Sequence, residues 1–235
     1  MTPSLEAHHL SVSRTARYYT LGDAGAHVSE VWIVCHGYGQ LARAFLASFE
    51  RVASPTRLIV APEALSRFYV DRPVPPNEQP PRVGAAWMTR EDRDHEIADQ
   101  VAYLDALHDL VRPAGPATVK LRVLGFSQGV ATAARWLALG RARADELILW
   151  AGAFPPDIEL AGFARRMGAG SVVLVAGLRD ELTSWTAADA QRERFTEAGV
   201  SARLLSFKGG HRLDDATLDQ LVAGGESPAR GDDPR

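Results

Sequence analysis

The chain has 235 residues, 46% of them hydrophobic, and a formal net charge of −3 at pH 7. These values suit one globular domain with a full core, and they give no electrostatic reason to expect binding to nucleic acid or to an anionic membrane. Residues 1–6 lack the pattern of a signal peptide, no apolar run is long enough for a membrane span, and Cys35 is the only cysteine, which excludes an intramolecular disulfide. We therefore expect a cytoplasmic protein.

Apolar runs of strand length alternate with segments of helical periodicity along most of the chain. In chain order the expected strands are 17–21, 31–35, 57–61, 119–126, 146–151, 171–176 and 202–207. The expected helices are 43–52, 97–111, 128–139, 187–198 and 214–222. Continuous apolar strands are typical of a parallel sheet that is buried on both faces. The pattern predicts an α/β domain over residues 1–223, with a mostly parallel sheet between two layers of helices.

Two segments lack this alternation. Residues 62–90 are rich in proline and read as a long irregular stretch, which in a compact domain is either functional or disordered. Its aromatic residues Phe68, Tyr69 and Trp87 favour a functional loop. Residues 224–235 consist mainly of glycine, proline and charged residues, and we expect them to form a disordered tail.

The motif Gly125-Phe126-Ser127-Gln128-Gly129 stands between the strand expected at 119–126 and the helix expected at 128–139. A G-x-S-x-G motif at a strand-to-helix junction is the signature of a nucleophile elbow, a sharp turn that exposes a serine hydroxyl. The glycines leave room for the strained backbone of such a turn. The motif therefore predicts that Ser127 is a nucleophile.

A serine hydroxyl is a weak nucleophile until a base removes its proton, so Ser127 needs a histidine. The only histidine after Ser127 is His211, which follows the last expected strand and two glycines. A loop at that position brings its side chain to the carboxyl ends of the strands. His36 is a second candidate base, but a histidine at this point more often bonds to the loop backbone.

The acid that orients this histidine is expected just past the carboxyl end of a strand, where ligands bind in parallel sheets. Asp180 follows the strand expected at 171–176 and fits this position. Its role would be to accept the Nδ1 proton of His211. Glu181, Asp214 and Asp215 are the alternatives, although the last two suit the first turn of the final helix.

The oxyanion of the reaction needs hydrogen-bond donors that are already in place. The backbone N–H of Gln128, next to the nucleophile, is one expected donor. The second is the backbone N–H of Tyr38, in the loop after the strand at 31–35, where flanking glycines permit a tight turn.

Together these segments resemble the phospholipase/carboxylesterase family of α/β-hydrolases, which includes the acyl-protein thioesterases. The resemblance spans roughly residues 18–222. It implies the α/β-hydrolase fold, the triad Ser127, Asp180 and His211, and an oxyanion hole formed by Tyr38 and Gln128. The segments that carry it are His36-Gly37-Tyr38-Gly39, Ala86-Trp87-Met88, Gly125-Phe126-Ser127-Gln128-Gly129, Gly177-Leu178-Arg179-Asp180 and Gly209-Gly210-His211.

We therefore predict a serine hydrolase that cleaves small-molecule carboxylic esters or thioesters through an acyl-enzyme on Ser127. Trp87 and Met88 are candidate substrate-binding residues, because their loop position allows them to line an acyl or aromatic pocket. No cofactor is implied, and neither the residues 90–96 nor the other histidines have a convincing metal-ligand spacing. An aryl or short-chain esterase and a non-catalytic ligand-binding relative of the same fold remain alternatives.

Overall fold

The computed structural model describes residues 4–71, 80–112 and 119–223. A seven-stranded sheet forms its centre, in the order β1-β3-β2-β6-β7-β8-β9. Strand β1 pairs antiparallel with β3, whereas the remaining neighbours pair in parallel. These strands are β1 Tyr18–Leu21, β2 Glu30–Cys35, β3 Arg57–Pro62, β6 Lys120–Phe126, β7 Glu146–Trp150, β8 Ser171–Gly177 and β9 Ser201–Phe207.

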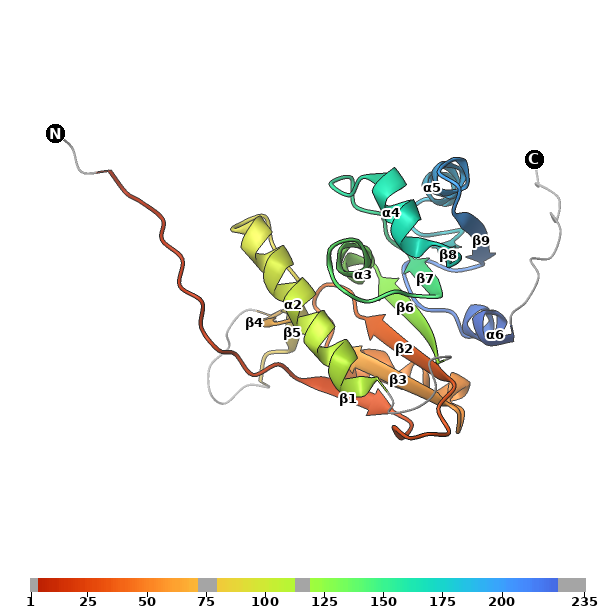
Figure 1. Cartoon of the computed structure of the whole chain (residues 1–235), viewed down its shortest axis with the longest axis horizontal. Helices are drawn as coiled ribbons and strands as arrows, with labels where there is room; N and C mark the ends of the chain where they lie inside the picture. The colour runs from red at the N-terminus through yellow and green to blue at the C-terminus, as the bar shows by residue number, and fades with distance from the viewer. Residues whose placement is uncertain (1–3, 72–79, 113–118, 224–235) are drawn as a thin grey trace.

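Helices cover both faces of this sheet (Figure 1). Side chains of successive residues in a strand point to opposite faces, so Ile33 and Cys35 of β2 pack in the core under α2, α3, α4 and α5, whereas Trp32 and Val34 pack in the core under α1 and α6. This arrangement confirms the predicted mostly parallel α/β fold. The helices are α1 Ala42–Ala47, the 3₁₀-helix η1 Glu50–Val52, α2 Arg93–Val111, α3 Gln128–Leu139, α4 Leu160–Met167, α5 Trp185–Glu197 and α6 Asp215–Ala223.

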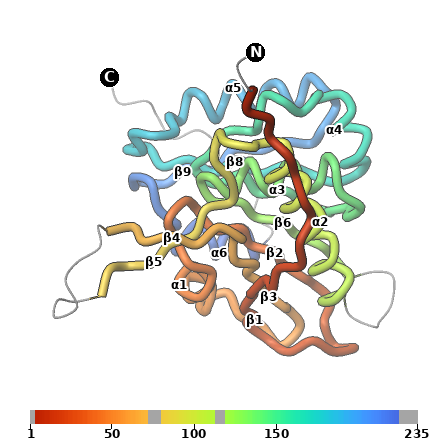
Figure 2. The backbone as a smooth tube through the Cα atoms, turned by 90° about the vertical axis from the view of Figure 1, so that its left-hand side faces the viewer, coloured from red at the N-terminus to blue at the C-terminus, as the bar shows by residue number. Residues whose placement is uncertain are grey.

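The segment 62–90 differs from the expected irregular stretch. It contains two short strands, β4 Ser66–Tyr69 and β5 Val83–Ala86, which pair antiparallel and project together from the side of the main sheet (Figure 2). The Gly39 N–H donates to the Ala85 carbonyl at 2.9 Å, and the Ala85 N–H donates to the Gln40 carbonyl at 3.1 Å. These bonds tie the strand pair to the loop after β2. Four-residue strands separated by prolines carry too few residues for a period-2 pattern to stand out.

Two other elements also differ from the expectation. The helix expected over 43–52 is divided into α1 and η1, and α4 was not expected at all. Helix α4 has only eight residues, and it begins where the Glu159 carboxylate accepts the backbone N–H groups of Ala161 and Gly162. The tail expected to be disordered, 224–235, lies outside the described residues.

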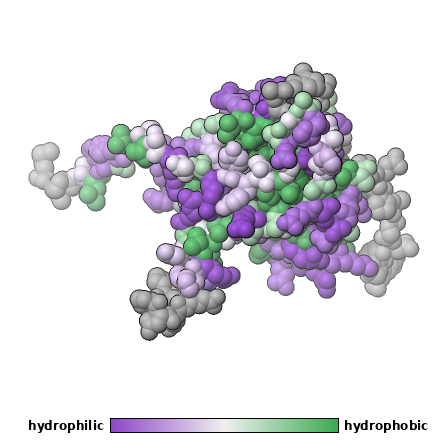
Figure 3. Space-filling model, turned by 90° about the horizontal axis from the view of Figure 1, so that it is seen from below, coloured by the Kyte–Doolittle hydropathy of each residue, from purple (hydrophilic) through white to green (hydrophobic). Residues whose placement is uncertain are grey.

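The surface of the domain is mainly hydrophilic on the face shown in Figure 3, where apolar patches are smaller and separated. Among the residues that the structure describes, no helix is both long and apolar enough to cross a membrane.

Candidate active site

Ser127 occupies a sharp turn between β6 and α3, with φ 54° and ψ −116°. Positive φ is costly for a residue with a Cβ, so the surroundings must impose this conformation. The Ser127 N–H donates to the Trp150 carbonyl at 2.9 Å, which anchors the turn to β7. The surroundings of Gly125 and Gly129 leave no space for a side chain. A Cβ on Gly129 would meet the carbonyl oxygens of Cys35 and His36, and a Cβ on Gly125 would meet the backbone of Gly129. The predicted elbow is therefore present, with Ser127 partly exposed.

His211 lies between Ser127 and Asp180. Its Nε2 is 2.9 Å from the Ser127 Oγ, and its Nδ1 is 2.9 Å from the Asp180 Oδ2. An ionised carboxylate can only accept, so Nδ1 carries the proton that donates to Asp180. The lone pair of Nε2 then faces the Ser127 hydroxyl, as a general base requires. The structure thus brings the three residues together in the expected order.

Asp180 is held rigidly. Its side chain is fully buried, and its Oδ1 accepts the backbone N–H groups of Leu182 at 2.8 Å and Thr183 at 3.0 Å. These bonds leave Oδ2 for His211.

The alternative acids lie elsewhere. Glu181 is exposed, and Asp214 accepts the backbone N–H and hydroxyl of Thr217 at the start of α6. Asp215 pairs with Arg51 at 2.9 Å. None of the three is bonded to His211 in the described structure, which favours Asp180.

The loop that carries His211 is fastened on both sides. The indole N–H of Trp150 donates to the Arg212 carbonyl at 3.0 Å, and the Arg179 N–H donates to the Gly209 carbonyl at 2.8 Å. The ring of Phe126 lies 5.1 Å from the imidazole of His211. Trp150 was not identified from the sequence as a residue of the site, because a tryptophan at the end of a buried strand reads as core packing.

The two expected oxyanion donors are free to bind a ligand. In the described parts of the chain, neither the Tyr38 N–H nor the Gln128 N–H donates to a protein acceptor. The turn around Tyr38 is fixed by its neighbours, since the Gly37 N–H donates to the Gln40 Oε1 at 2.7 Å and the Gly39 N–H to Ala85. Within the described structure both N–H groups are thus unpaired, that of Tyr38 in the loop after β2 and that of Gln128 at the first residue of α3.

Trp87 and Met88 have different environments. Trp87 is buried, and its indole N–H donates to the His36 carbonyl at 2.8 Å, so it packs inside the protein. Met88 is partly exposed, and its sulfur lies 3.2 Å from the Nη1 of Arg135. The Gln128 side chain bonds to the backbone of both residues. Of the two candidate substrate-binding residues, Met88 is thus the one that is partly exposed.

His36 has a structural role in the loop after β2, and Cys35 is a buried core residue at the end of β2. The Nδ1–H of His36 donates to the Gly37 carbonyl at 2.8 Å, and its Nε2 accepts the Ala64 N–H at 3.1 Å. Burial lowers the pKa of His36, which keeps the ring neutral in this role. Burial also raises the pKa of Cys35 to about 12, so that thiol stays protonated and unreactive.

The fold matches many solved structures. A crystal structure of esterase PE8 is 21% identical in sequence, with a TM-score of 0.66 and coverage of 90% of this chain and 98% of the other. The Zea mays acyl-protein thioesterase 2 is 20% identical, with a TM-score of 0.66 and coverage of 89% and 97%. A carboxylesterase from Mesorhizobium loti is 18% identical, with a TM-score of 0.66 and coverage of 89% and 95%. At these identities the likeness establishes the α/β-hydrolase fold.

No curated protein matches the sequence closely enough to count as a relative. A family model does match, however: that of the FSH1 serine hydrolases, over residues 32–215, more than three quarters of the chain. The matched segment includes the elbow, the acid and the histidine described above. The expected likeness to serine hydrolases of the α/β-hydrolase fold is therefore confirmed, and the chain belongs to the FSH1 family of serine hydrolases.

Proposed function

We propose that this protein hydrolyses carboxylic esters or thioesters through an acyl-enzyme formed on Ser127. The observation that carries the proposal is the continuous hydrogen-bonded series from the Ser127 Oγ through His211 to Asp180, with both links at 2.9 Å. Such a series activates a serine hydroxyl, because the imidazole can take its proton while the carboxylate stabilises the resulting imidazolium.

The reaction proceeds in two steps. Ser127 attacks the carbonyl carbon as His211 accepts its proton, and His211 returns that proton to the alcohol or thiol, which leaves. Water then gives up a proton to His211 and attacks the acyl carbon. The bond from that carbon to the Ser127 Oγ breaks, His211 returns the proton to Oγ, and the acid is released. In both steps the unpaired N–H groups of Tyr38 and Gln128 hold the oxyanion, and each supplies roughly 3–4 kcal/mol of transition-state stabilisation.

An apolar acyl group suits the surroundings of Ser127. In the strand order, β2 and β8 lie on opposite sides of β6 and β7. Large apolar side chains are exposed in the loop after β2 and the β4–β5 pair bonded to it, and also in the segment after β8. On the β2 side these are Tyr38, Tyr69, Val70 and Val83; on the β8 side they are Leu178, Leu182 and Trp185. The ring of Tyr38 packs 5.1 Å from that of Phe68, which joins the loop after β2 to β4. We take these side chains as the candidates for contact with an acyl group.

The proposal is tested by the hydrolysis of p-nitrophenyl acetate, butyrate, octanoate and palmitate, and of a matched acyl thioester. Ser127→Ala should reduce kcat by about a thousandfold or more. Ser206→Ala, which changes an exposed serine on β9, is the matched control and should keep the wild-type rate. A Ser127→Ala variant that retains wild-type activity would refute the assignment. The chain-length profile then separates a short-chain or aryl esterase from an enzyme for longer acyl groups.

A further inference from the structure

The first described residues form an exposed N-terminal arm, residues 4–15, which extends away from the domain (Figures 1 and 3). It buries no apolar side chain: Leu5, Leu10 and Val12 are 104%, 86% and 76% exposed. Within the described structure, the hydrogen bond and the ring contact that its side chains make with the domain both come from His9. Ordering a chain segment costs conformational entropy, which apolar burial usually offsets. The position of the arm against the domain therefore depends on the interactions that hold His9.

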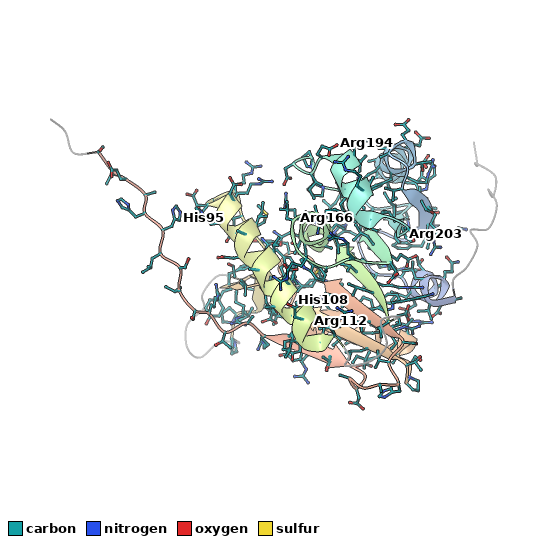
Figure 4. The ribbon with its side chains drawn as sticks, in the orientation of Figure 1. His95, His108, Arg112, Arg166, Arg194 and Arg203 are labelled. Atoms are coloured by element: carbon teal, nitrogen blue, oxygen red, sulfur yellow. The ribbon has the colours of Figure 1, made fainter. Side chains whose placement is uncertain are left out.

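His9 meets two residues at the start of α2. Its Nε2 lies 3.1 Å from the Oδ1 of Asp92, and the Nδ1 of His95 lies 2.7 Å from the same oxygen. The two imidazole rings stack with their centroids 3.9 Å apart and their planes at 24°. Figure 4 shows His95 at the start of α2, beside the arm and far along the helix from His108.

The three donor atoms have the spacing of metal ligands. They all lie within 4.8 Å of one another. A tetrahedral zinc ion with bonds of about 2.0–2.1 Å holds its ligand atoms about 3.3 Å apart. Two of the three separations, 3.1 and 2.7 Å, are already close to that value. Imidazole nitrogens donate in the plane of the ring, so the stacked rings of His9 and His95 must rotate apart to point both nitrogens at one ion. All three residues are exposed, which leaves their side chains free to make that rotation.

The ligand types select the cation. Two imidazole nitrogens with one carboxylate oxygen suit zinc, nickel, cobalt or copper, whereas magnesium and calcium prefer sites made of oxygen atoms. We propose that His9, Asp92 and His95 bind one divalent cation of the zinc class, with water completing its coordination, and that this ion fastens the N-terminal arm to the start of α2.

The site lies apart from the proposed chemistry at Ser127. It shares no residue with the hydrogen-bonded series of the candidate active site, and the cation takes no part in hydrolysis. Sequence spacing gave no sign of it, because His9 and Asp92 are 83 residues apart. Its test therefore uses metal binding and the state of the arm, and it is independent of whether the protein hydrolyses esters.

The experiment is calorimetric titration of the tag-free full chain with Zn²⁺, together with the absorption spectrum of the Co²⁺ form. The wild type should bind one ion per chain. His9→Ala, Asp92→Asn and His95→Ala should each weaken binding by at least about tenfold, since even loss of an outer-shell partner has that effect. His8→Ala is the matched control: it removes the neighbouring exposed histidine of the arm and should leave the affinity unchanged.

The state of the arm gives a second measurement. Zn²⁺ should slow tryptic cleavage after Arg14 in the wild type and should have no such effect in His95→Ala. If the wild type fails to bind one equivalent, the proposal is wrong. It is equally wrong if His95→Ala binds like the wild type, or if His8→Ala loses as much affinity as His9→Ala, because the two adjacent histidines of the arm would then bind the ion by themselves.

Discussion

The side chain of Gln128 holds the backbone of Trp87: its Oε1 accepts the Trp87 N–H at 3.0 Å, while its Nε2 donates to the Met88 carbonyl at 2.9 Å. The residue next to the nucleophile thus has two roles. Its backbone N–H is a proposed oxyanion donor, and its side-chain amide fixes the segment between β5 and α2. The turn at Ser127 and the segment bearing Met88 are coupled through this one residue.

Replacing Gln128 by alanine separates these roles, because the backbone N–H remains. Two neutral hydrogen bonds are lost, each worth about 0.5–1.5 kcal/mol. We expect kcat/KM for an acyl ester to fall by about tenfold, mainly through a higher KM as Met88 loses its position. Steady-state kinetics measure how the effect divides between kcat and KM. Gln191→Ala is the control. Gln191 lies on α5, and its side chain accepts a comparable bond from the Phe154 N–H, so its loss should leave KM unchanged.

Asp180→Asn should lower kcat by about four orders of magnitude while the fold persists. The amide can donate to Nδ1 of His211, which favours the tautomer with its proton on Nε2 and removes the base that faces Ser127. Comparison of kcat with Glu181→Gln, which changes the adjacent exposed carboxylate, gives the matched control. Equal rates for the two variants would show that Asp180 is not the acid of the triad.

Gly129→Ala should prevent stable folding or cost more than about 4 kcal/mol of unfolding free energy, because the new Cβ would meet two backbone carbonyls that cannot move aside. Gly199→Ala is the contrasting variant. Gly199 has φ 82° with open space around it, so alanine there meets only the backbone strain, about 1–2 kcal/mol. Urea unfolding of both proteins measures the difference. Equal losses of unfolding free energy in the two variants would contradict the close packing around Gly129.

Stability should fall as the pH is lowered through the range in which unfolded histidine gains a proton, near pH 6.5. Burial lowers the pKa of His36 in the folded protein, so below that pH the unfolded chain binds more protons than the folded one. The stability that neutral His36 provides is therefore complete above pH 6.5 and decreases at lower pH.

His36→Gln gives the corresponding comparison. The variant should be less stable than the wild type at pH 7.5, because it alters the two buried hydrogen bonds of His36. The difference in unfolding free energy between the two proteins should be smaller at pH 5. Urea unfolding at the two pH values measures it. A gap that widens on acidification would contradict the buried neutral histidine.

Much of the fold could be predicted because its signals are local. The apolar runs in β2, β7 and β8 are continuous, and the G-x-S-x-G motif marks the junction at Ser127 without any knowledge of tertiary contacts. The segment 62–90 was misread for the opposite reason: β4 and β5 are stabilised by pairing with each other and with the loop at Gly39 and Gln40, which are distant in sequence.

The candidate site shows the same division. Ser127, His211 and Asp180 could be chosen from motifs and from their order after strands. Two other contacts could not be predicted, because each joins residues that are distant in the chain. The bond from Trp150 to the Arg212 carbonyl spans 62 positions, and the contact of His9 with Asp92 spans 83. Burial also separates Trp87 from Met88, although the two are adjacent in the chain.

The most direct test of the account is to treat the protein with a fluorophosphonate and to locate the adduct by mass spectrometry of its peptides. The reagent reacts only with a serine whose hydroxyl is activated by a base. We predict one adduct per chain, on Ser127, which is absent from Ser127→Ala and greatly slowed in Asp180→Asn. An unlabelled wild type, or label on a different serine, would contradict the assignment of Ser127 as the nucleophile.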